Sequence, residues 1–379
     1  MFHVNLFLAF LYVAARLVLP LPWSVAGRAV LAVVLLIVSK YHLLQIWTFG
    51  TMYSPEMPRP AVLVMGWLFV AFFLMILLTA LFDVGLIVSW VARKRRALPG
   101  TTRTRGRYAV MIVALLLSAI GVQQALRVPD VQRVEVAIRN LPPALDGFKL
   151  VQLTDLHLQR LMNAEWATQV VARTNALSPD LVVITGDLID GTVDARRPDI
   201  QPLADLKARH GVITSLGNHE YYFGAPEWTA EFQRLGMRVL VNENTAIGDP
   251  GRALYIAAVT DMVATRFGLD NAPDLSRAMS GIPAGAPVVL LSHRPVDMLR
   301  NAAAGVGLQL SGHTHGGMIR GFDLIVKQAN GGVVSGRYDF GGMTLYVSNG
   351  TGLWNGFPVR LGVPSEITEF VLKAKAGAP

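Results

Sequence analysis

The chain of 379 residues has no cysteine and few charged residues for its length. The absence of cysteine excludes disulfide bonds and thiolate metal ligands. Charged residues make up 16% of the sequence, against about 25% in a typical soluble protein. Hydrophobic residues make up 52%, and the excess lies in the first third, where long apolar runs occur. We therefore expect a transmembrane region over residues 1–127 and a globular domain over residues 128–379.

Acidic residues are almost missing from the first of these regions. Residues 1–127 hold 12 basic and 2 acidic residues, whereas residues 128–379 hold 22 and 24. The basic character therefore belongs to the apolar region. A nucleic-acid-binding protein needs a basic surface on its globular part, and the balanced charge there argues against that class. The expected partners are a membrane, in which the chain is integral, and no nucleic acid.

Four apolar stretches come close to the length of about 20 residues that a membrane-spanning helix needs. They predict an all-α transmembrane bundle of about four helices. Lys40 and His42 interrupt the second stretch, so whether it spans fully is left open. A cleaved signal peptide is the alternative for the first stretch, but a basic start and a small-residue cleavage site are missing. The four stretches are Val4–Leu19, Ala29–Trp47, Ala61–Phe82 and Tyr108–Leu126.

The segment between the last two stretches is strongly basic. It contains Arg93-Lys94-Arg95-Arg96 and then Arg103, Arg105 and Arg107, with no acidic residue among them. Basic loops stay in the cytoplasm. The last helix then leads outward, so we expect a multi-pass protein of the inner or plasma membrane with its globular domain outside the cytoplasm.

Strand and helix patterns alternate in the globular part, which predicts the α/β class. A helical pattern covers Ala164–Ala176. Short apolar runs predict buried strands. Five of these runs are followed directly by polar segments that contain His, Asp or Asn. These five runs are Lys149–Thr154, Leu181–Thr185, Gly211–Leu216, Val288–Leu291 and Leu308–Leu310.

The polar residues that follow these strands form a ligand set for metal ions. Functional groups in α/β sheets gather beyond the carboxyl ends of the strands, so these side chains should converge. Imidazole, carboxylate and amide ligands without sulfur suit Mn²⁺, Fe or Zn²⁺ and do not select among them. The motifs are Asp155-Leu156-His157, Gly186-Asp187, Gly217-Asn218-His219-Glu220, His293 and Gly312-His313-Thr314-His315.

Such a set predicts a hydrolytic site with two divalent metal ions. Two ions about 3.5–4 Å apart stabilise the attacking and leaving oxygens of an in-line displacement. A water between them is activated to hydroxide, and His219, beside Asn218, is placed to protonate the leaving group. Arg160, Arg294 and Arg337 are further candidates for contact with phosphate oxygens, although a surface position is the commoner role of arginine.

Together these motifs resemble the signature of the calcineurin-like metallophosphoesterases over roughly residues 147–350. The membrane-anchored bacterial branch, with proteins of the YkuE and YaeI type, is most similar. The resemblance implies a four-layer α/β/β/α sandwich of two mixed sheets. It also implies the ligand roles. Asp155, His157, Asp187 and His315 would hold the first metal, and Asp187 (bridging), Asn218, His293 and His313 the second, with His219 as the catalytic acid.

The expected function is therefore a metal-dependent hydrolase, with manganese among its possible metals. It would act on phosphate esters or anhydrides at the membrane surface, and a phosphodiesterase on a possibly lipid-linked substrate is favoured. One alternative, implied by the resemblance, is a lipid pyrophosphatase of the UDP-2,3-diacylglucosamine type. A second is a membrane transporter or sensor whose globular domain only binds a phosphorylated ligand. Lys40 and Asp83, charged residues within or beside predicted spans, support the second alternative.

Overall fold

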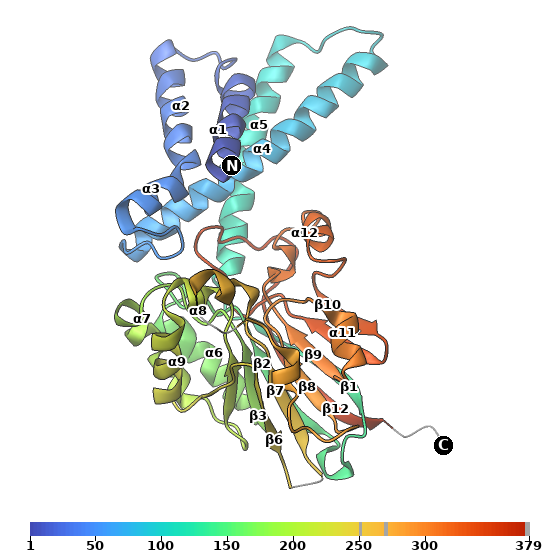
Figure 1. Ribbon diagram of the computed structural model, residues 1–379. Coiled ribbons are helices and arrows are strands. Elements are labelled where there is room, and N and C mark those ends of the chain that lie inside the picture. The colour runs from blue at the N-terminus through green and yellow to red at the C-terminus, as the bar shows by residue number, and fades with distance from the viewer. Residues whose placement is uncertain (250–251, 269–271, 376–379) are drawn as a thin grey trace. The chain divides into compact units, whose positions relative to one another are not determined.

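The computed structural model describes residues 1–249, 252–268 and 272–375 (Figure 1). Its internal contacts divide the chain into two units. The first holds residues 1–124 together with Asn355–Leu361, and the second holds residues 125–354 and 362–379. The predicted domain 128–379 was continuous, so the return of Asn355–Leu361 to the first unit is a feature that the sequence did not indicate. Residues 250–251, 269–271 and 376–379 of that domain lie outside the described residues.

The first unit is helical, in agreement with its apolar sequence. Among the described residues, two helices are long and apolar enough to cross a membrane, α4 (Arg59–Ala92) and α5 (Gly100–Ala125). They cover the third and fourth predicted spans. α5 begins earlier than expected, so Arg103, Arg105 and Arg107 lie in its first two turns and not in a loop. Trp67 and Ser118 join the two helices, because the Trp67 indole donates to the Leu115 carbonyl and the Ser118 hydroxyl donates to the Trp67 carbonyl.

The other two predicted spans differ from the expectation of about four spanning helices. The first is α1 (Phe2–Val13), continued by a π-helical segment to Val18, and is shorter than a full span. The second is broken at Lys40 into α2 (Val25–Ser39) and α3 (Tyr41–Phe49), which are bent by 57°. The Lys40 ammonium donates to the His3 carbonyl at 3.0 Å, so the charge is held at the break. By length and composition the unit has two spans, or three if the bent pair is one.

The second unit contains two mixed sheets of six strands each. The first sheet has the order β1-β12-β2-β3-β4-β5, in which β12 pairs antiparallel with β2 and the other neighbours are parallel. The predicted strand over Leu181–Thr185 is confirmed to the residue. The strands are β1 (Asp130–Arg139), β2 (Phe148–Leu153), β3 (Leu181–Thr185), β4 (Val212–Ser215), β5 (Arg238–Val239) and β12 (Glu366–Lys375).

The second sheet has the order β10-β11-β9-β8-β7-β6. Its four central strands, β11, β9, β8 and β7, are parallel, and the two edge strands are antiparallel to their neighbours. The strands are β6 (Glu243–Ile247), β7 (Leu254–Ala258), β8 (Val288–Leu291), β9 (Leu308–Ser311), β10 (Gly336–Phe340) and β11 (Met343–Val347).

Helices cover the outer faces of both sheets, and this produces the four layers that the resemblance implied (Figure 1). In β3, Leu181 and Val183 point into the core between the sheets, whereas Val182 and Ile184 pack towards α6 and α9. A strand buried on both faces needs an unbroken apolar run. In the second sheet, α10 and α11 cover the outer face. The helices are α6 (Ala164–Ala176), α7 (Val193–Ile200), α8 (Asn218–Tyr222), α9 (Ala225–Arg234), α10 (Leu275–Ala278), α11 (Met298–Ala303) and α12 (Asp323–Ala329).

Replacing Phe370 by alanine should destabilise the second unit. The Phe370 ring is fully buried in β12 and meets the Tyr346 ring of β11 edge-on at 5.0 Å, so it joins the two sheets. Removing such a ring lowers the free energy of unfolding by about 3–5 kcal/mol, which denaturant unfolding of the detergent-purified protein measures. Leu299→Ala is the control, because Leu299 is 72% exposed and should change stability by less than about 0.5 kcal/mol. Equal losses in the two variants would contradict this assignment of the core.

Candidate metal centre

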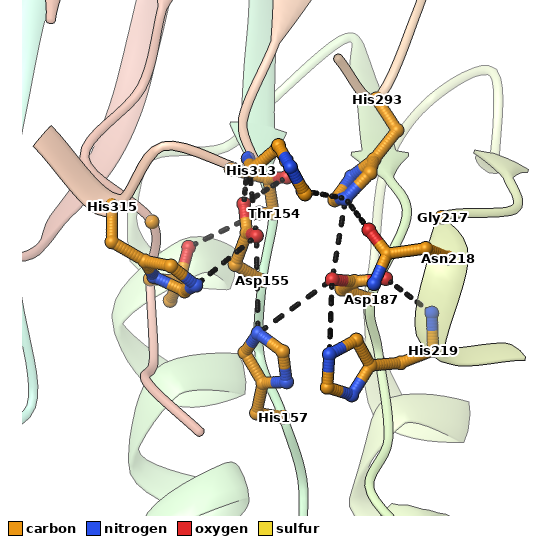
Figure 2. Close-up of polar contacts among 12 residues, drawn as sticks. Thr154, Asp155, His157, Asp187, Gly217, Asn218, His219, His293, His313 and His315 are labelled. Carbon is orange, nitrogen blue, oxygen red and sulfur yellow. Dashed lines mark hydrogen bonds and ion pairs between the residues drawn. The ribbon is translucent and has the colours of Figure 1, made fainter. Parts of the chain in front are cut away.

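The eight predicted site residues meet beyond the carboxyl ends of five strands (Figure 2). Two of these strands, β8 and β9, belong to the second sheet, and the other three to the first. The site therefore joins the two sheets at one edge of the sandwich. The residues are Asp155 and His157 after β2, Asp187 after β3, Asn218 and His219 after β4, His293 after β8, and His313 and His315 after β9.

A first cluster consists of Asp155, His157 and His315. Oδ1 of Asp155 lies 3.8 Å from His157 Nε2 and 3.6 Å from His315 Nε2. All three side chains are buried. The Asp155 carboxylate also accepts hydrogen bonds from the Thr154 hydroxyl at 2.8 Å and from the His313 backbone amide at 3.1 Å. These bonds fix the direction in which the carboxylate points.

A second cluster forms around Asp187. Its Oδ2 lies 3.2 Å from Nε2 of His293, and the same nitrogen is 3.2 Å from both His313 Nδ1 and Asn218 Oδ1. The His293 Nδ1–H donates to the Thr185 carbonyl at 2.8 Å. This bond leaves the lone pair of Nε2 directed at the cluster, as a metal ligand requires.

Asp187 connects the two clusters. Its Oδ2 also lies 3.8 Å from Nε2 of His157. That nitrogen is buried and makes no hydrogen bond. Metal ligands lie about 2.0–2.2 Å from a shared ion, so two of them stand roughly 3–4 Å apart. These separations suit a cation between the groups better than a direct hydrogen bond, so the residues fit divalent metal binding. The ligand roles themselves stay a prediction.

The negative charges of the buried aspartates are balanced by neighbouring histidines. Burial alone would raise the pKa of Asp155, but the nearby His315 and His157 lower it well below its usual value. Burial lowers the pKa of His293, yet Asp187 raises it to about 10. Burial and the nearby charge of His293 lower the pKa of His313 to about 3. The carboxylates therefore stay ionised, and cations that displace the histidine protons would meet a site with net negative charge.

At this edge, backbone strain is found mainly at the residues that are candidate metal ligands. Five site residues other than glycine have positive φ angles between 45° and 68°. Such left-handed conformations cost roughly 1–3 kcal/mol each and persist where the surrounding structure imposes them. Packing around Asp187 is close, because a Cβ at Gly217 would stand 2.3 Å from Asp187 Oδ1. The five residues are Asp155, His157, Asp187, His313 and His315.

Asp190 is a site residue that we did not predict from the sequence. It is fully buried, and its Oδ1 accepts from Nδ1 of His157 at 3.2 Å and from Nδ1 of His219 through a short hydrogen bond. It therefore orients a proposed ligand and the proposed acid together. The sequence indicates only that Asp190 lies near the site, because it follows the Gly186-Asp187 pair after two residues, and not that it contacts both histidines.

Glu220 belongs to a predicted motif, but the sequence did not indicate a role for it. The structure shows that it binds backbone amides. Its carboxylate accepts from the backbone amides of Asp187, Leu188 and Gly217 at 3.0, 2.7 and 2.7 Å. Burial and the charge of Asp187 raise the pKa of Glu220 to about 7. Glu220 therefore ties the start of α8 to the turn that carries Asp187.

Arg294, one of the three predicted arginines, contacts a proposed ligand. Its Nε donates to Asp261 Oδ2 at 2.6 Å, and its Nη2 lies 3.3 Å from Asn218 Oδ1. The Arg294 side chain is 31% exposed, whereas that of Asp261 is fully buried. The buried carboxylate fixes a guanidinium group beside the second cluster, where an anion from solvent can reach it.

Replacing Asp190 by asparagine should weaken metal binding, because the amide no longer stabilises His157 in its orientation. Loss of such a partner typically costs about 10–100-fold in metal affinity. Titration of Mn²⁺ into the full-length protein measures the dissociation constant. Asp339→Asn is the matched control, because Asp339 lies in β10 with a side chain that is 68% exposed. Unchanged affinity in Asp190→Asn would show that Asp190 does not support the ligands.

Comparisons with known proteins agree with this geometry. The Calcineurin-like phosphoesterase family matches residues 148–317. An uncharacterized metallophosphoesterase of Campylobacter jejuni is 37% identical over 269 residues, which is 70% of this chain and 69% of the relative. A transmembrane protein with metallophosphoesterase domain from Bos taurus is 34% identical, over 76% of this chain and 67% of the relative. The metallophosphoesterase YkuE of Bacillus subtilis is 33% identical, over 62% and 82%. The chain therefore belongs to the calcineurin-like metallophosphoesterases.

Proposed function

We propose that this protein hydrolyses phosphate esters or anhydrides of lipid-linked substrates at the membrane surface, with a phosphodiester favoured. Membership of the family supports a phosphoester hydrolase, and the His/Asp clusters suggest divalent metal ions. The proposal goes further in naming two ions, with Mn²⁺, Fe or Zn²⁺ as candidates, and a substrate held in a membrane.

The distribution of exposed apolar side chains carries this choice of substrate. Among the described residues of the second unit, six large hydrophobic side chains are exposed. All six lie in segments that follow the carboxyl ends of β7, β8 and β9, the edge at which the metal clusters form. Apolar groups gathered at one edge mark a lipid or ligand surface. The six are Met262, Phe267, Val296, Leu299, Leu324 and Ile325.

The side chains at the site have different roles in the proposed hydrolysis. Bound divalent cations would supply an activated water and neutralise charge on the phosphoryl oxygens. Asp190 holds the Nδ1–H of His219, so Nε2 of His219 faces Asp187 at 3.9 Å and can protonate the leaving oxygen. Arg294 adds one fixed positive charge beside Asn218. A phosphodiester carries a single negative charge, which this arrangement can neutralise.

The transporter or sensor alternative was based on the charged residues Lys40 and Asp83. Lys40 binds the His3 carbonyl, as described above, and Asp83 is held by the Arg16 guanidinium at 2.9 and 2.6 Å and by the Tyr12 hydroxyl at 2.9 Å. Both charges thus have structural partners within the helical unit. They stabilise the helices, so their presence alone does not favour an ion pathway.

Hydrolysis should depend on metal, on His219 and on the apolar edge. With Mn²⁺, the full-length protein should hydrolyse bis-(p-nitrophenyl) phosphate in solution and a phospholipid diester in vesicles. EDTA, Asp187→Ala and His219→Ala should each abolish both activities. Absence of turnover on a panel of esters with several metals would contradict the proposed hydrolase.

The double substitution Leu324→Ser with Ile325→Ser separates the lipid-linked substrate from a soluble one. These side chains are 68% and 61% exposed. Losing their insertion into lipid should lower turnover of the vesicle substrate about tenfold, while turnover of the soluble ester stays unchanged. The control is Leu145→Ser, whose side chain is half-buried in the turn Pro143–Leu145 before β2 and so lies at the opposite edge of the sheet. An equal fall on both substrates would refute a lipid-facing role for these residues.

We further propose that the phosphoesterase domain lies outside the cytoplasm. The support is the basic segment Arg93-Lys94-Arg95-Arg96 between α4 and α5, since basic segments are retained in the cytoplasm. Protease added to intact spheroplasts should cleave residues 128–379, and inverted membrane vesicles should protect them. The opposite pattern would place the site in the cytoplasm, where it would favour the UDP-2,3-diacylglucosamine-type pyrophosphatase.

A further inference from the structure

Residues Asn355–Leu361 leave the phosphoesterase unit and become part of the helical unit. We call this segment the strap. Asn355 and Val359 are fully buried, Arg360 is 1% exposed and Phe357 is 8% exposed. Burial of a seven-residue loop with its backbone requires partners for its polar groups, and the helices supply them.

Three hydrogen bonds fasten the strap along its length. His42 Nε2 donates to the Gly356 carbonyl at 2.9 Å, and the Asn355 amide donates to the Tyr53 carbonyl at 2.8 Å. The Arg360 backbone amide donates to the Gly121 carbonyl at 3.0 Å. Gly121 lies in α5, four residues before the end of the helix.

Two glycines let the strap approach the helices closely. A Cβ at Gly66 of α4 would stand 2.8 Å from Pro358 Cγ. A Cβ at Gly121 of α5 would stand 2.6 Å from Val359 Cγ2 and 3.2 Å from Leu361 Cγ. Between them, the Phe357 ring meets the Phe73 ring edge-on at 4.9 Å. Glycine in a helix interior costs about 1 kcal/mol relative to alanine, and here the cost is offset by contact with the strap.

The chain on either side of the strap attaches to the loops that carry the first metal cluster. Before the strap, the Thr351 amide donates to the Thr154 carbonyl at 2.7 Å, and the Gly352 amide donates to the Asp155 carbonyl at 3.0 Å. After it, Gly362 forms a β-bridge with Ile319, four residues beyond His315. Only residues 353–354 separate the strap from Gly352, and none separates it from Gly362.

We propose that α4 and α5 are a receptor for the strap, and that its binding there holds Asp155 and His315 in their ligand positions. An extended residue spans at most about 3.6 Å. The connections between the strap and these loops are therefore too short to absorb a movement of the strap, which would displace the loops as well. Gly66, Gly121 and His42 are then positioning residues for the metal centre. The inference rests on the ligand set of the proposed function, but it concerns metal binding and does not require a particular substrate.

The experiment displaces the strap in the full-length protein in nanodiscs. Gly66→Leu and Gly121→Leu add side chains where the strap lies. Each should raise the dissociation constant for Mn²⁺ about tenfold, the scale on which supporting contacts act. Hydrogen exchange should accelerate at the Arg360 amide and at the amides of Thr351 and Gly352. For a milder change, His42→Ala should reproduce part of the effect, and His42→Gln, which keeps a donor, should restore it.

Two other helix glycines supply matched controls. A Cβ at Gly85 of α4 would meet nothing within 4 Å, and the atoms nearest to a Cβ at Gly106 of α5 belong to the Phe82 ring of α4 and not to the strap. Gly85→Leu and Gly106→Leu should leave Mn²⁺ affinity within about twofold of the wild type, although Gly106→Leu disturbs helix packing.

Three results would overturn the proposal. One is faster exchange at Arg360 with unchanged Mn²⁺ affinity, which would uncouple the strap from the metal centre. Another is an equal loss of affinity in the two controls, which would indicate general destabilisation. The third is unchanged exchange at Arg360 in both Gly66→Leu and Gly121→Leu, which would show that the helices do not hold the strap. Failure to hydrolyse any ester would count against the proposed function and leave this inference standing.

Discussion

The arrangement of the site in the second unit depends on two buried carboxylates. Asp155 and Asp187 sit among histidines at the edge where two sheets meet, and an unpaired buried carboxylate is strongly unfavourable. The ion-pair partners that surround them are imidazoles, which can give up their protons to a cation. Asp190 and Glu220 then fix the imidazoles and the turns. The strained backbone at five ligand positions is tolerable only because both sheets hold it in place.

The helical unit adds a second constraint that is independent of the metal. Its glycines at 66 and 121 pack against the strap, which belongs to the same unit, and its charged residues Arg16, Lys40 and Asp83 bind one another or the backbone. The charges that first suggested transport therefore have partners within this unit.

Much of the fold could be predicted from local sequence. Leu181–Thr185, Val288–Leu291 and Ala164–Ala176 were predicted with the bounds that the structure has, because strands buried on both faces and an amphipathic helix leave clear patterns. Other elements left weaker patterns. β6 and β10 are edge strands with mixed burial, and β5 has only two residues. The charge of Lys40 indicated an interruption of the second predicted span. The 57° bend between α2 and α3 depends on where the neighbouring helices lie.

The sequence by itself determined the chemistry of the site. Histidine, aspartate and asparagine after five strand ends predicted a hydrolytic metal site, because functional groups gather at that edge of an α/β sheet. The resemblance of the motifs then implied the phosphoesterase family. Tertiary structure alone decided three other features: the sharing of Asp190 between His157 and His219, the apolar edge around the clusters, and the return of the strap to α4 and α5. Each depends on contacts between segments distant in sequence, and such contacts leave no periodicity or spacing in the chain from which they can be read.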